Sequence, residues 1–169
     1  MARLLFSGTV TFDDAKAVFA ALLRERVDFV VIGSMAMAAH GLVRATHDLD
    51  LFVDPERGNI ERLKKALRSL FDDPTIDEID AEELAGEYPA VEYTPPHGRF
   101  SLDLLTRLGE AFGWEDLKAG SGPMTIGSLV VRIATPRTLY RMKRDTVRPQ
   151  DRADAARIRE AFRLPAEGD

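Results

Sequence analysis

The sequence contains no cysteine, and it has only three histidines and one tryptophan among 169 residues. The absence of cysteine excludes a disulfide scaffold, a thiol nucleophile and a thiolate zinc site. The histidines, His40, His47 and His97, are scattered along the chain and do not form a histidine-rich metal motif. We therefore interpret His40 and His47 as packing or hydrogen-bonding residues.

Long hydrophobic runs are also absent. No apolar stretch approaches the roughly 20 residues that a membrane-spanning helix needs. Residues 1–6 are too short and too soon interrupted to be a signal peptide. With 45% hydrophobic and 30% charged residues, the composition is typical of a single soluble domain with a sizeable core. We expect a cytoplasmic protein without a membrane partner.

The formal net charge of -5 conceals an uneven distribution. Residues 72–92 carry nine acids and no lysine or arginine, whereas residues 132–163 carry ten bases against four acids. Both segments could be ordinary solvated faces. The basic segment could alternatively bind RNA, whose phosphates attract clustered arginines with a salt-dependent affinity.

Hydrophobic periodicity predicts strands that alternate with helices. The predicted strands cover residues 28–32, 48–53 and 100–105, and residues 125–133 form a hairpin or a strand bent at Gly127. The predicted helices cover about 11–26, 35–40, 55–71, 136–145 and 149–162, with Asp54 before Pro55 as an N-cap. Residues 72–92 are predicted to be irregular with at most a short helix. This order indicates an α/β (α+β) fold, a small mixed sheet flanked by helices.

Three aspartates on predicted strands are the strongest functional signal. Asp48 and Asp50 are two residues apart and so project from the same face of a strand. If the strand with Asp103 pairs beside them, three carboxylates converge, and like charges about 4 Å apart repel by about 4 kcal/mol at an effective dielectric of 20. Such a group either has raised pKa values or holds cations, and an all-oxygen ligand set favours Mg²⁺. Upstream, Gly33 permits close backbone approach and Ser34 offers a hydroxyl to a phosphate.

One predicted strand ends in Gly33-Ser34 and is followed by a helix, by Asp48-Leu49-Asp50 on the next strand and by a later Asp103. This order of motifs resembles that of the DNA polymerase β-like nucleotidyltransferase superfamily. The segment from Arg44 to Leu51 looks most similar to small prokaryotic AbiEii-like nucleotidyltransferases, which include toxins of toxin–antitoxin pairs. The resemblance implies a nucleotidyltransferase core at residues 1–135 and a C-terminal helical segment packed on it at 136–169.

The resemblance also implies a division of roles within the site. Asp48, Asp50 and Asp103 would hold Mg²⁺ or Mn²⁺ and be catalytic together with Lys143. The nucleotide-binding residues would be Gly33, Ser34, Arg44, Lys143 and Asp151. The implied reaction is NMP transfer from an NTP such as ATP to a hydroxyl or phosphate of tRNA, a protein or a small molecule, with a cognate antitoxin as a partner. The alternative is a catalytically inactive module of the same fold that binds a nucleotide or a partner.

Overall fold

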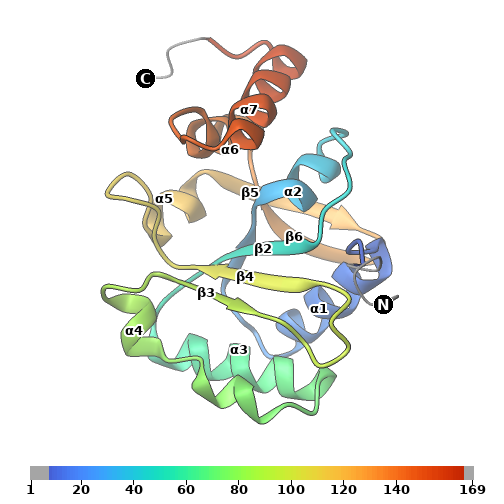
Figure 1. The fold of residues 1–169 in the computed structure, drawn as a ribbon, viewed down its shortest axis with the longest axis vertical. Coiled ribbons are helices and arrows are strands. Elements are labelled where there is room, and N and C mark those ends of the chain that lie inside the picture. The colour runs from blue at the N-terminus through green and yellow to red at the C-terminus, as the bar shows by residue number, and fades with distance from the viewer. Residues whose placement is uncertain (1–7, 166–169) are drawn as a thin grey trace, which may run out of the picture.

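The computed structural model describes residues 8–165, so residues 1–6, in which no signal peptide was expected, lie outside it. Its centre is a six-stranded mixed sheet in the order β3-β4-β2-β1-β6-β5. Helices α1 and α3 lie together on one side of this sheet, and α2, α6 and α7 lie on the other (Figure 1). Within residues 8–165, none of the helices has the length and apolar character that a membrane crossing requires.

The observed elements follow the predicted order closely. The strands are β1 (Phe29–Val31), β2 (Asp48–Val53), β3 (Ala90–Tyr93), β4 (Ser101–Leu105), β5 (Ser121–Ile126) and β6 (Leu129–Ala134). The helices are α1 (Phe12–Arg24), α2 (Gly33–Ala39), α3 (Arg57–Leu70), α4 (Ala81–Ala85), α5 (Trp114–Ala119), α6 (Pro136–Arg144) and α7 (Pro149–Phe162). A 3₁₀ helix, η2, covers Pro74–Glu78. The predicted mixed α/β architecture is confirmed.

The prediction for residues 72–92 underestimated their regular structure. This segment contains η2, α4 and β3, and β3 is an edge strand paired antiparallel with β4. Only Tyr93 in β3 is buried, so the strand lacks the run of apolar residues that identifies a strand from sequence. Helix α5 was missed for a related reason, because with six residues it is too short to show a helical period.

Helix α3 begins two residues later than the sequence suggested. Its N-cap is Glu56, whose carboxylate accepts hydrogen bonds from the amides of Gly58 and Asn59 at 2.8 and 2.9 Å. Asp54 instead accepts from the amide of Glu56 at 2.9 Å and stabilises the turn before the helix. The prediction of Asp54 as the cap was therefore wrong, because the longer Glu56 side chain reaches the free amides of the first turn.

The register of β2 against β4 positions the polar residues of the sheet. The two strands are parallel, with Asp48 opposite Ser101 and Asp50 opposite Asp103. The leucines that alternate with these residues are fully buried on the other face, namely Leu49, Leu51, Leu102 and Leu104. Because side chains alternate between the two faces, burial of the leucines places the aspartates together on the opposite face.

Candidate active site

Asp50 and Asp103 form a hydrogen-bonded pair of carboxyl groups across β2 and β4. Burial, followed by the hydrogen bond and the charge of Asp103, raises the pKa of Asp50 to about 7. Burial also raises the pKa of Asp103, and the negative charges of Asp48 and Glu92 add to this effect. Burial and the neighbouring negative charges therefore favour a state in which the two carboxyl groups share one proton.

Asp48 is on the same face of β2 as Asp50, two residues earlier, and its charge reaches both members of the pair. Across the described residues, no three His, Cys, Asp or Glu side chains are grouped closely enough to hold a metal ion as they stand. The site is therefore a close pair of carboxyl groups with a third carboxylate beside it.

Gly33 makes the close packing around Asp50 feasible. It has φ +64°, in the left-handed region that glycine tolerates, and it is the first residue of α2. A Cβ atom at this position would overlap a carboxylate oxygen of Asp50. The missing side chain thus lets the end of β1 approach the Asp50 carboxyl group, and it leaves the next residue, Ser34, buried at the wall of the site.

A cluster of cationic side chains faces the carboxyl pair from the C-terminal helices and the segment before β2. The Lys143 Nζ atom of α6 lies 3.2 Å from an Asp151 oxygen and 3.0 Å from an Asp154 oxygen, both on α7. Arg44 donates to the two carboxylate oxygens of the same Asp154 at 3.2 and 3.0 Å. One carboxylate thus binds two cations that come from distant parts of the chain.

Asp154 is fully buried, and Gln150 adds a further hydrogen bond to it at 3.1 Å. Burial alone would raise the pKa of Asp154, but the hydrogen bonds and charges of Arg44 and Lys143 bring it below its ordinary value. Asp154 was not among the predicted site residues. Its spacing of three residues from Asp151 on one helix was the available signal, since residues three apart share a helical face.

These two groups line one pocket of about 240 Å³. Seven of the eight predicted site residues line it: Ser34, Arg44, Asp48, Asp50, Asp103, Lys143 and Asp151. The eighth, Gly33, lies beside it against Asp50. Arg148 and Gln150, which the sequence analysis did not identify, complete the wall formed by the start of α7. One side of the pocket is acidic and the other basic, an arrangement suited to a ligand that carries both a metal and phosphates.

Two of the histidines have the structural contacts expected of them. The Nε2 atom of His40 lies 2.9 Å from the carbonyl oxygen of Ala134, and its ring contacts Phe162 edge-on. The Nδ1 atom of His47 lies 2.6 Å from the carbonyl oxygen of Gly8. Each ring therefore joins segments that are far apart in the sequence.

Comparisons with known proteins identify the family and the fold. The family model described as "Nucleotidyl transferase AbiEii toxin, Type IV TA system" matches residues 17–162. Among solved structures, a candidate nucleotidyltransferase from Thermotoga maritima is similar with a TM-score of 0.52 and 15% sequence identity, over 89% of this chain and 87% of that chain. At this identity the structural likeness shows the fold alone. No curated protein matches the chain in sequence.

Replacement of Gly33 by alanine is expected to cost more stability than the left-handed backbone conformation alone accounts for. Any non-glycine residue in the left-handed region costs about 1–2 kcal/mol, but Gly33→Ala also displaces the Asp50 carboxyl group. The matched control is Gly98→Ala, since Gly98 has φ +67° and open space around it. We expect thermal unfolding to show a larger loss of stability for Gly33→Ala than for Gly98→Ala. Equal losses would contradict the close contact with Asp50.

The raised pKa of Asp50 predicts a pH dependence of stability in metal-free buffer. A folded-state pKa above the ordinary 3.8 contributes stability below about pH 4 that is lost as the pH rises through about 7. Asp50→Asn removes this titration, so the variant should be more stable than the unmodified protein at pH 8, by up to about 4 kcal/mol. The advantage should disappear near pH 4 in urea unfolding curves. Asp13→Asn, at an exposed position, should show no such crossover.

Asp154 should have the opposite pH dependence. Because its pKa is lowered, its contribution to stability is present above about pH 4 and is lost as the pH falls through the folded-state pKa. We expect Asp154→Asn to lose about 3 kcal/mol of unfolding free energy at pH 7, since two cations lose their buried partner. Urea unfolding at pH 7 and pH 3 measures this loss, which should shrink at the lower pH. Asp145→Asn, at the exposed end of α6, should change stability by less than about 0.5 kcal/mol.

Proposed function

The chain belongs to the AbiEii nucleotidyltransferase toxin family, and from this premise we propose that it transfers NMP from an NTP to an acceptor hydroxyl or phosphate. The observation that supports this reaction best is the single pocket in which the carboxyl pair faces Lys143 and Arg44. A triphosphate needs cations around its oxygens, and nucleotidyl transfer needs carboxylates near its α-phosphorus.

The reaction we propose proceeds by in-line displacement. An acceptor oxygen forms a bond to the α-phosphorus, and the bond from that phosphorus to the oxygen bridging to the β-phosphate breaks. The electron pair of the broken bond leaves with pyrophosphate, and the acceptor proton passes to the Asp103 carboxylate. Lys143 and Arg44 balance charge on the triphosphate, while Ser34 at the start of α2 offers a hydroxyl and an amide to a phosphate.

The donor set fits a hard divalent cation. Asp50 and Asp103 are hydrogen-bonded to each other, and Asp48 on the same face of β2 offers a third carboxylate whose charge reaches both. Mg²⁺ often binds through one or two carboxylates and fills its other positions with water and substrate phosphates, so a complete protein cage is not needed. We propose Mg²⁺, or Mn²⁺ in its place, held by these three aspartates. When bound, the ion would stabilise negative charge that develops on the phosphate oxygens.

For the acceptor we propose RNA, with tRNA as the first candidate. Arg148 lines the pocket and its side chain is 79% exposed, and Arg152 is exposed one helical turn further along α7. Exposed arginines beside a transfer site suit a polyanionic acceptor better than a neutral one. Since the matching family model is described as a toxin of a type IV toxin–antitoxin system, a cognate antitoxin is the proposed cellular partner.

The test is to incubate the protein with each labelled NTP, Mg²⁺ and total tRNA, and then to identify the modified product by mass spectrometry. We expect one tRNA position to gain an NMP in a reaction that fails when Mg²⁺ is chelated. Asp48→Ala and Asp50→Ala should each lower the rate by at least about 10³-fold, because each removes a carboxylate proposed to hold the metal ion. Asp13→Ala is the matched control and should retain full activity, since Asp13 is exposed on α1 away from the pocket.

Transfer that survives in both Asp48→Ala and Asp50→Ala would overturn the proposed catalytic site. An NMP attached to a protein in a whole lysate, with none on tRNA, would replace RNA with a protein acceptor. Nucleotide binding without any product would favour the binding-module alternative.

A further inference from the structure

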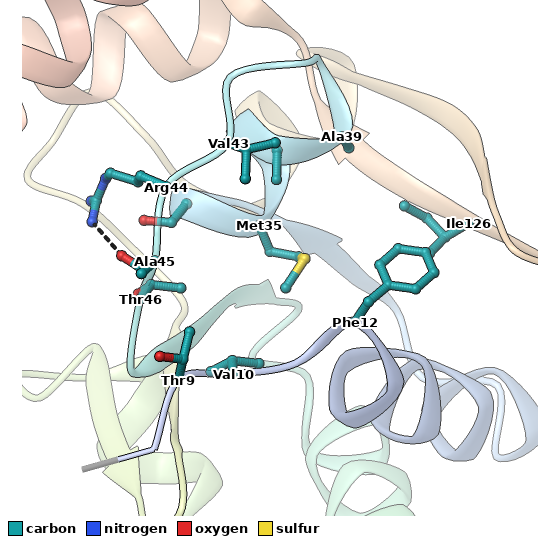
Figure 2. Close-up of a pocket in the computed structure, with 12 residues that line it drawn as sticks. Thr9, Val10, Phe12, Met35, Ala39, Val43, Arg44, Ala45, Thr46 and Ile126 are labelled. Atoms are coloured by element: carbon teal, nitrogen blue, oxygen red, sulfur yellow. Dashed lines mark hydrogen bonds between the residues drawn. The ribbon is translucent and has the colours of Figure 1, made fainter. Parts of the chain in front are cut away.

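A second cavity of about 480 Å³ adjoins the candidate active site and has no role in the proposed reaction. The segment before α1, helix α2, the segment between α2 and β2, and the β5–β6 hairpin all contribute to its wall (Figure 2). Val10, Met35 and Ile126 are buried within it, whereas Phe12 and Val43 are 50% and 73% exposed. The large apolar side chains of Phe12 and Val43 are thus exposed to water beside an apolar cavity.

The lining of this apolar pocket selects an uncharged ligand. It contains no acidic residue, and its one charged residue, Arg44, directs its guanidinium away from the cavity (Figure 2), where it binds Asp154. A charged group placed here would lose its hydration without gaining a partner of opposite charge. Thr9 and Ser34 supply hydroxyl groups that can orient the polar edge of a ligand, whereas the Thr46 hydroxyl is bound to the backbone of Asp48. A flat ring with a few polar atoms matches this combination.

The two pockets share part of their walls. Four residues line both of them: Ser34, Arg44, Ala45 and Thr46. A ligand in the apolar pocket would therefore touch the same segment that faces the phosphates in the catalytic pocket. Because the carbonyl of Thr46 also accepts a hydrogen bond from the amide of Val10 at 2.8 Å, this shared segment is tied to the wall of the apolar pocket.

We propose that the apolar pocket binds a neutral aromatic ring and that it is occupied together with the catalytic pocket. The ring has two sources that share this chemistry, the base of the bound nucleotide or a separate small aromatic molecule. The second source would make the pocket a site through which a small ligand changes nucleotide affinity. Only the choice between these sources rests on the proposed function, because ring binding itself needs no catalysis.

The experiment uses indole as the probe and the ¹³C-labelled methyl groups of the full chain as the NMR reporters. We expect indole to shift the methyl signals of Met35, Val43 and Ile126 in a saturable manner. Ala38→Leu and Ala39→Leu add bulk to the pocket wall and should weaken indole binding at least fivefold. Two variants are used so that a folding defect in one does not decide the result. Ala156→Leu, the same change on the exposed face of α7, should bind indole normally.

The source of the ring follows from a displacement series with Mg²⁺-ATP and Mg²⁺-tripolyphosphate. Displacement by ATP alone assigns the pocket to the nucleotide base. Retention of indole with both compounds assigns it to a separate ligand. Displacement by both compounds, scattered methyl shifts, or undiminished binding in Ala38→Leu and Ala39→Leu would overturn the proposal. Ring binding without any nucleotidyl transfer would leave this proposal intact and count against the proposed function alone.

Discussion

The register between β2 and β4 is the constraint on which the site depends. Four leucines of these strands must be buried on one face, and strand geometry then projects Asp48, Asp50 and Asp103 from the other. A shift of one residue would expose the leucines and bury the aspartates, which makes the alternative register very costly. The free energy of the hydrophobic core thus holds two mutually repulsive carboxyl groups together. The proton shared between Asp50 and Asp103 is the consequence of that forced proximity.

The basic wall of the pocket is assembled in a different way, through one buried carboxylate. Asp154 on α7 binds Lys143 from α6 and Arg44 from the segment before β2. The C-terminal helices are therefore linked to the segment before β2 by an ion-pair network. A buried network of this kind contributes little net stability compared with apolar packing, but it defines where the two cations lie. That placement is what a triphosphate would require.

The uneven charge of the chain now has a structural interpretation. The acidic segment, residues 72–92, forms η2, α4 and the edge strand β3, and among its acids none lines the catalytic pocket. The basic segment forms β6, α6 and α7, and it contributes Lys143 and Arg148 to that pocket. The net charge of -5 is therefore a poor guide to the site, because Lys143 and Arg148 line the pocket whereas the acidic segment reaches it only through the charge of Glu92 on Asp103.

The sequence by itself determined the kind of fold and located most of the predicted residues that line the candidate site. Local signals were sufficient where they were strong, as in β2, whose predicted bounds of 48–53 agree with the structure, and in α1, where Thr11 and Asp14 form a capping box. Spacing also identified Gly33, Ser34 and the three aspartates, because strand periodicity and a tight turn can be recognised in the local sequence. Edge strand β3 and short helix α5 show no such local pattern and were missed.

Only the tertiary structure decided which distant residues meet. No local pattern shows that Asp154 binds Arg44, 110 residues earlier, or that Ile126 and Phe12 line one cavity with Arg44. The overlap between a Cβ atom at Gly33 and Asp50 likewise depends on how β1 pairs with β2. Hydrophobic periodicity indicates which face of a helix or strand is apolar. The residues that pack against that face are selected by the packing of the whole chain.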